Sequence, residues 1–249
     1  MANWQDPQTT GVSAATVGVP RAARDAGLRS YMLSVYNYMA SGVLLTGIVA
    51  FGLAATGIAQ QIFFNGGLLR WVALFAPLAY LMLSGRSLQG KSLGSMQVFY
   101  WTFAALMGVS MSVLPLLYTG VSIAQTFFAT AAAYGGLSLY GYTTKRDLGP
   151  IGTFLHMAVW GLLIVMLLNI GIVAFTGHGS RGADMLISAV GVLLFAGLTA
   201  ADTQKVKSMY FYAQGSELVA KSAIMGALTL YLDFVNMFQF LLSFIGNRR

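Results

Sequence analysis

The sequence predicts an all-α integral membrane protein with seven transmembrane helices, and three observations support this prediction. First, 57% of the 249 residues are hydrophobic and 8% are charged, against roughly 25% charged in an average soluble domain. Second, apolar runs close to the ~20 residues that cross a bilayer recur along the chain. Third, the 29 glycines, with many alanines and serines, suit helices that pack closely in lipid. A transmembrane β-barrel would instead show short segments of alternating hydrophobicity.

Residues 1–27 form the first element, which we expect to be a disordered N-terminal tail. They are mostly polar or small and end in a basic region that contains Arg21 and Arg24. This segment is too long and too mixed to be the charged start of a cleaved signal peptide. We therefore expect a membrane domain over residues 28–249, with a first span that is not removed.

Seven apolar stretches are expected to span the membrane within this one domain. They lie near residues 30–58, 71–85, 95–118, 121–143, 151–175, 185–204 and 223–245. The second is the shortest and contains Pro77, which kinks a helix but is tolerated where neighbours satisfy the freed carbonyl. Pro115 is expected to bend or end the third span. Pro150 is expected to start the fifth, because proline fits the first helical turn.

The basic residues predict an N-terminus that faces the cytoplasm, since positively charged loops stay on the inner side. In this orientation the inner side receives Arg21, Arg24, Arg29, Arg86, Lys91, Lys145, Arg146, Lys205, Lys207 and Lys221, and the outer side receives Arg70, Arg181, Arg248 and Arg249. An odd number of spans then places the C-terminus outside, unless the seventh segment is re-entrant.

Composition also excludes several kinds of site. The absence of cysteine rules out disulfides and thiolate ligands, and two histidines are too few for a histidine-rich metal cluster. The net charge of +7 comes from residues between the spans, where membrane orientation and anionic lipid account for it. We therefore expect the lipid bilayer as a partner and no nucleic acid.

Two aspartates, Asp202 and Asp233, lie inside the last two apolar stretches of a chain with seven acidic residues. A charge at hydrocarbon depth costs at least ~2.5 kcal/mol, so such residues normally face a partner or a watery cavity. Asp202 shares a helical face with Thr199, and Asp233 shares one with Asn236. The alternative is that both aspartates only reach the inner interface, because Asp202 lies three residues before Lys205.

The sixth span runs inward and the seventh outward, so the two aspartates can meet in the inner half of the membrane. Their depths match if the sixth helix continues past Lys205, or if the seventh begins near Ser216, a suitable N-cap. Two carboxyls in one dry site cannot both ionise cheaply, so they would share a proton and titrate as a unit. Such a pair is a proton-sensitive latch between the two helices. Once ionised, Asp202 and Asp233 are candidate transient ligands for Ca²⁺, which prefers oxygen.

Three segments resemble the Bax inhibitor family of small seven-span proteins. They are residues 139–148 (LYGYTTKRDL), 201–204 (ADTQ) and 227–238 (ALTLYLDFVNMF), and the resemblance covers nearly all of residues 28–249. It implies a seventh helix at the centre, wrapped by the other six. It also implies a pH-sensitive calcium leak channel of the bacterial inner membrane, gated by an aspartyl pair that corresponds to Asp202 and Asp233. The ions would be Ca²⁺ and protons, with no cofactor.

A basic residue at the inner end of the second span is implicated by the same resemblance, and Arg86 matches it best. The alternative is that Arg86 is an ordinary positive charge of an inner loop. The chain departs from family members that carry a glutamate in the second span, because residues 71–83 contain no acid. That departure weakens the case for ion conduction and leaves the pH-sensing pair unaffected.

Two other functions stay open at this stage. One is a non-conducting regulator that binds a membrane protein partner such as a quality-control protease, which the basic N-terminal tail favours. The other is an intramembrane aspartyl protease, which also uses two aspartates on adjacent helices. Those proteases resemble one another in a Gly-x-Gly-Asp motif, whereas Asp233 follows Tyr231 and Leu232. Two weaker polar positions are Asn169, expected to join two helices, and His156, expected to be a structural hydrogen-bonding group.

Overall fold

The computed structural model describes residues 21–85, 92–177, 180–213 and 215–249, and it is helical throughout these ranges apart from short connections. The helices are α1 (Arg21–Ala55), α2 (Ile58–Gln60), η1 (Gln61–Asn65), α3 (Leu69–Gly85), α4 (Leu93–Met111), α5 (Leu114–Leu117), α6 (Gly120–Thr143), α7 (Gly149–Thr176), α8 (Arg181–Tyr212) and α9 (Ser216–Ile245). The only β-pairing among the described residues is an isolated bridge between Tyr118 and Arg248. The all-α prediction is confirmed.

Each of the seven predicted apolar stretches corresponds to a helix, but not all of these helices are equally apolar. Five are long and apolar enough to cross a membrane, or six if the bent pair of α2–η1 and α3 forms one span. The five are α1, α4 continued by α5, α7, α8 and α9. Helix α6 is outside this set because it is rich in glycine, serine, threonine and tyrosine. A count of seven crossings therefore stays a prediction.

Two of the predicted helix boundaries need correction. Helix α1 begins at Arg21, so the last residues of the expected tail, 21–27, are helical. Between α1 and α3 the chain forms α2 and η1, which the hydropathy pattern did not predict. These two meet α3 at an angle of 105°. Positive φ angles at Gly57 (76°) and Gly67 (51°) produce the turns on either side, a conformation that glycine adopts without strain.

Pro115 and Pro150 act as the sequence predicts. Pro115 lies in the first turn of α5, directly after α4 has ended, so the third stretch is broken there. Pro150 lies in the first turn of α7, where its missing N–H is not needed. Pro77 lies inside α3, which continues past it.

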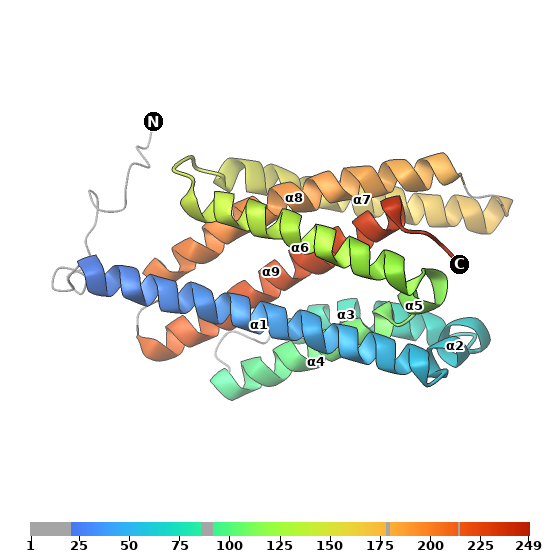
Figure 1. Ribbon diagram of the computed structural model, residues 1–249, viewed down its shortest axis with the longest axis horizontal. Helices are drawn as coiled ribbons and strands as arrows, with labels where there is room; N and C mark the ends of the chain where they lie inside the picture. Colours follow the sequence, from blue (N-terminus) through green and yellow to red (C-terminus); the bar gives the residue numbers. More distant parts are fainter. Residues whose placement is uncertain (1–20, 86–91, 178–179, 214) are drawn as a thin grey trace.

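The core of the bundle is built around α9, which crosses it obliquely (Figure 1). Its main contacts are with α1, α4, α6 and α8, and 56% of its most apolar stretch is buried, more than in any other candidate span. Helices α3 and α7 make their main contacts with α4 and α8 instead. The structure thus places four helices around α9, whereas the family resemblance implied six.

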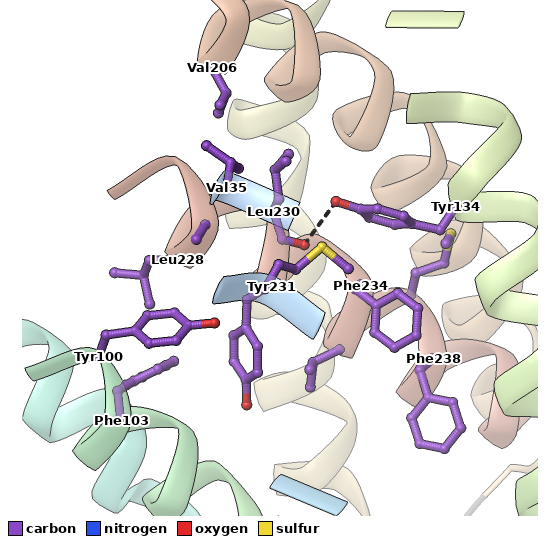
Figure 2. Packing of buried hydrophobic residues seen from close by; sticks show 14 of the residues in the cluster. Val35, Tyr100, Phe103, Tyr134, Val206, Leu228, Leu230, Tyr231, Phe234 and Phe238 are labelled. Carbon is purple, nitrogen blue, oxygen red and sulfur yellow. Dashed lines mark hydrogen bonds between the residues drawn. The ribbon is translucent and has the colours of Figure 1, made fainter. Parts of the chain in front are cut away.

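Aromatic and hydroxyl groups hold α9 in the core just before Asp233. Tyr231 packs edge-on against Tyr100 and Phe103 of α4 (Figure 2). Its hydroxyl hydrogen-bonds the hydroxyl of Thr46 on α1 at 2.7 Å. From α6, the Tyr134 hydroxyl donates to the backbone carbonyl of Leu230 at 3.2 Å, as Figure 2 shows. Three helices therefore fix the depth of α9 at the turn that carries Asp233.

Candidate functional site: an aspartyl pair between the last two long helices

Asp202 of α8 and Asp233 of α9 come together in the structure, because both helices extend beyond their apolar stretches. Helix α8 continues past Lys205 to Tyr212, and α9 begins at Ser216. Both conditions for matching the two depths are therefore met. The N-cap prediction was wrong by one residue: Gly215 is the cap, with a φ of 90°, and it offers no side-chain hydrogen bond.

The two carboxyl groups are buried and hydrogen-bonded to each other. Asp202 is 2% exposed and Asp233 is 4% exposed, and a side-chain hydrogen bond joins them. An ionised carboxylate only accepts hydrogen bonds, so this contact requires one proton between the two groups. Oδ2 of Asp233 is fully buried and lacks a donor among the described residues. The geometry is that of an acid pair that holds at least one proton.

Close glycine contacts on two sides position the backbone of α8 beside Asp202. A Cβ on Gly141 of α6 would lie 2.2 Å from the carbonyl oxygen of Ala200. A Cβ on Gly152 of α7 would lie 3.0 Å from the Cβ of Ala201. Both glycines therefore allow a neighbouring helix to approach α8 within two residues of Asp202. Gly141 belongs to the LYGYTTKRDL segment, so this packing gives one of the family motifs a structural role.

Thr199 and Asn236, the polar companions predicted from helical spacing, do not donate hydrogen bonds to the aspartates. The hydroxyl of Thr199 donates to the carbonyl of Phe195 on its own helix at 2.7 Å. The amide of Asn236 donates to the carbonyl of Leu232 at 2.8 Å. Helical spacing places each side chain on the face of its aspartate. Each nevertheless donates its hydrogen bond to a backbone carbonyl one turn earlier in its own helix.

Groups from α1 and α6 lie around the pair, and sequence reasoning missed them. The hydroxyl of Tyr134 donates to the Leu230 carbonyl, in the turn of α9 that precedes Asp233. Beside Asp202, the Thr203 hydroxyl bonds Ser138 at 3.0 Å, and Ser138 in turn bonds the hydroxyl of Tyr36 at 2.6 Å. These contacts join residues up to 102 positions apart in the chain. No local spacing could have brought them together.

His156 of α7 contacts Asp202, although the sequence favoured a purely structural role. Its Nδ1 lies 2.8 Å from the carbonyl oxygen of Gly152, so Nδ1 carries a hydrogen and donates it. Its Nε2 then points towards Oδ2 of Asp202, 3.6 Å away. The imidazole is half-exposed while the carboxyl is buried. His156 therefore lies on the accessible side of the pair.

The remaining predicted positions have different outcomes. Arg86 lies outside the described residues. The basic side chain that interacts with both carboxylates in the described structure is Lys205, one turn after Asp202 on α8. Asn169 joins two helices as expected, because its amide donates to Asp184 of α8 at 2.9 Å.

The described residues contain no group of three acidic or histidine side chains that could hold a metal ion. Asp202 and Asp233 alone supply few of the six to eight oxygens that Ca²⁺ takes. Transient binding of Ca²⁺ by the pair stays a prediction.

Comparison with known proteins identifies the family. The family described as inhibitor of apoptosis-promoting Bax1 matches residues 28–249 of this chain. The chain belongs to this Bax inhibitor family. Within it, the chain is 43% identical over 225 residues to an uncharacterized protein of Rickettsia prowazekii, covering 90% of this chain and 92% of the relative. It is 38% identical over 226 residues to the inner membrane protein YbhL of Escherichia coli, covering 90% of this chain and 94% of the relative.

A third relative, from Caulobacter vibrioides, is 40% identical over 234 residues, covering 90% of this chain and 91% of the relative. The match to the Bax inhibitor family confirms the resemblance carried by the three motifs. It also agrees with the apolar helices in describing a helical membrane protein. The aspartyl pair joins two of these motifs, since Asp202 lies in the ADTQ segment and Asp233 in the segment 227–238.

Proposed function

We propose that this Bax inhibitor family protein is a passive cation leak, most suited to Ca²⁺, whose opening is controlled by protonation of the Asp202–Asp233 pair. One observation carries the proposal: two buried carboxyls from different helices meet in a hydrogen bond that needs a shared proton. Losing the proton leaves two negative charges in one dry site, where they repel strongly. The protonated pair holds α8 and α9 together, and the ionised pair drives them apart.

The proposed membrane arrangement has seven crossings, with α9 central and the N-terminus in the cytoplasm. Its location is the inner membrane, as for the relative YbhL. The starts of α1, α7 and α9 and the ends of α6 and α8 gather at one end of the bundle, at the left in Figure 1. Lys205 and Lys207 lie near this end, and Arg181 begins α8 at the other. This separation supports the orientation derived from the positive-inside rule.

Arg86 remains part of the proposal as a second cation for the ionised pair. Its guanidinium is charged at every relevant pH and would stabilise the deprotonated state. Arg86→Ala should therefore move the midpoint of flux to higher pH, because the pair would keep its proton longer. If the midpoint of flux did not change in a variant that still inserts into the membrane, Arg86 would be only a positive charge of an inner loop.

The experiment that tests the function is Ca²⁺ uptake into liposomes that hold the purified protein and a Ca²⁺-sensitive dye. Uptake should be low in acid and rise as the pH increases, because the open state is the ionised one. The matched control is Asp184→Asn, which changes an acid of the same helix that is bonded to Asn169, far from the pair. This control should keep the wild-type pH profile.

Three results would contradict the proposal. Absence of Ca²⁺ uptake at every pH would favour the non-conducting regulator, especially if a membrane protease co-purified with the chain. Ca²⁺ uptake that did not depend on pH would refute gating by the aspartyl pair. Cleavage of a transmembrane peptide that required both aspartates would favour the aspartyl protease.

A further inference from the structure

A cavity of about 440 Å³ lies between α7 and α8 and reaches the aspartyl pair from one side. Its lining includes Thr153, His156 and Trp160 from α7, with Asp202 and Lys205 from α8. Asp233 does not line it. Of the two carboxyls, Asp202 is therefore the one that faces the cavity, and Asp233 lies behind it.

The lining indicates that water fills this cavity even though its walls are transmembrane helices. Asp202, His156 and Lys205 are polar or ionisable, and such groups in a membrane face either a partner or water. The hydrocarbon tails of lipids cannot solvate the Lys205 ammonium or the exposed part of the His156 imidazole, so water is the better filling. The half-exposed imidazole of His156 has a hydrogen-bond partner in Gly152, but its Nε2 side is open towards Asp202.

The cavity is also large enough for a hydrated ion. A water molecule occupies about 30 Å³ in the liquid, so the volume of about 440 Å³ corresponds to roughly fifteen waters. A Ca²⁺ ion with roughly six to eight oxygen ligands fits within this volume without losing its water shell. The ammonium of Lys205 does not block the space, because this side chain is exposed and can turn outward.

The contacts of α7 explain why an opening exists here. Helix α7 packs mainly on α8, and only 11% of its most apolar stretch is buried. At Gly152 the two helices approach closely beside Ala201, and beyond this contact the bulkier His156 and Trp160 line the cavity. The cavity is thus a lateral opening at the inner half of α7, away from the aromatic core around α9.

We propose that this cavity is the inner vestibule of the ion pathway, through which hydrated cations reach Asp202 and then the pair. The inference rests on the proposed leak function and specifies its route. Cations approach from the side between α7 and α8, and not along α9, where Tyr100, Phe103 and Tyr231 fill the core. His156 and Asp202 form the inner end of this vestibule, and Asp233 lies on the far side of the latch.

The chain has no cysteine, so a single introduced cysteine is the only site that a thiol reagent can modify. A small quaternary-ammonium thiosulfonate, which is permanently charged, is the reagent that tests the vestibule. Thr153→Cys and Met157→Cys both lie on the cavity lining. The matched control is Phe154→Cys, which neighbours Thr153 on α7, is 67% exposed and does not line the cavity. Ser216→Cys, an exposed position at the start of α9, reports which side of the membrane the reagent has reached.

We expect the two vestibule cysteines to be modified roughly tenfold or more faster than Phe154→Cys, because a charged reagent avoids hydrocarbon. Modification should occur from the side that labels Ser216→Cys, and it should abolish most of the Ca²⁺ uptake. Protein mass measures the labelling, and dye fluorescence in the same liposomes measures the flux.

The two measurements separate the possible failures. Vestibule cysteines that label no faster than Phe154→Cys would overturn the vestibule, whatever the flux. Rapid labelling with unchanged Ca²⁺ uptake would also overturn it, because the cavity would then lie off the pathway. A wild-type protein without any uptake would instead refute the leak function, while the labelling still decided whether the cavity holds water.

Discussion

At the scale of the residue, the proposed function depends on whether Asp202 and Asp233 hold a proton between them. Each carboxyl alone would be an isolated charge in a helix that crosses a membrane, and burial of such a charge is costly. Together they form one hydrogen bond with each other. The unpartnered Oδ2 of Asp233 shows that the protein supplies no other donor at this position among the described residues. In the proposed latch, the pair is therefore stable when it holds a proton and repels itself when fully ionised.

The first prediction at this scale concerns Asp233→Asn and Asp202→Asn. Asparagine keeps hydrogen-bonding capacity but cannot ionise, so the repulsion that opens the latch would not develop. At every pH, Ca²⁺ uptake into liposomes that hold either variant should stay as low as wild-type uptake is at acidic pH. If both variants kept the wild-type pH profile, the gate would lie elsewhere in the molecule.

The second prediction concerns the nearby positive charge. Lys205 interacts with both carboxylates and thereby favours their ionised form. Lys205→Gln removes this charge, so the pair should keep its proton to higher pH and the midpoint of uptake should rise. Because Lys205 is exposed, screening by solvent limits the rise to less than about one pH unit. The change is read from a pH series, with Lys221→Gln as a control whose ammonium pairs with Glu217 instead. A lower midpoint in Lys205→Gln would contradict the claim that the Lys205 charge favours the ionised pair.

At the scale of the element, glycines decide how closely helices approach the site. Gly141 of α6 faces the backbone of α8 at Ala200, and Gly152 of α7 faces Ala201. In lipid, such small residues replace the hydrophobic effect as the basis of tight helix packing. They bring α6 and α7 against α8 beside Asp202, and the surroundings of the pair follow from that placement.

Gly141→Ala is the prediction that tests this packing. The new methyl group would lie 2.2 Å from a backbone carbonyl oxygen, so α6 and α8 must separate at a cost of about 1–3 kcal/mol. The control is Gly136→Ala on the same helix, where a Cβ meets nothing within 4 Å and the better helix propensity of alanine is at worst neutral. Thermal unfolding in detergent should show a clearly lower melting temperature for Gly141→Ala alone. Equal stability of the two variants would show that α6 does not depend on this contact.

At the scale of the whole molecule, α9 links the latch to most of the bundle. It contacts α1, α4, α6 and α8, and Tyr134, Tyr231 and Thr46 hold it at the turn before Asp233. Helix α7, by contrast, packs mainly on α8. Helix α8, which carries Asp202, contacts α6 and α9 as well as α7. In the proposed opening, a change at the pair therefore acts on all three of these helices.

Membrane topology is the prediction at this scale. Seven crossings place Ser216, at the start of α9, on the inner side and the C-terminal Arg249 on the outer side. A membrane-impermeant thiol reagent added to intact cells should modify Arg249→Cys and spare Ser216→Cys. In inverted vesicles the pattern should reverse. Modification of both from the same side would mean that α9 is re-entrant or that α6 does not cross.

The sequence by itself determined the helical membrane class and the breaks at Pro115 and Pro150, and it singled out the two aspartates as the candidate site. These follow from local properties, because hydropathy, proline geometry and the cost of a buried charge act on short stretches of chain. It also predicted that Asp202 and Asp233 could meet, provided that their helices were long enough.

Only the tertiary structure decided what surrounds the pair. Tyr134 comes from α6, His156 from α7, and the Tyr36 and Ser138 hydroxyls from α1 and α6. Their approach depends on helix crossings and on the space left by glycines, which no periodicity in one segment encodes. For the same reason Thr199 and Asn236 lay on the predicted faces yet bonded their own backbone. The pair itself is a local property of two helices, whereas its environment and the cavity leading to it are properties of the bundle.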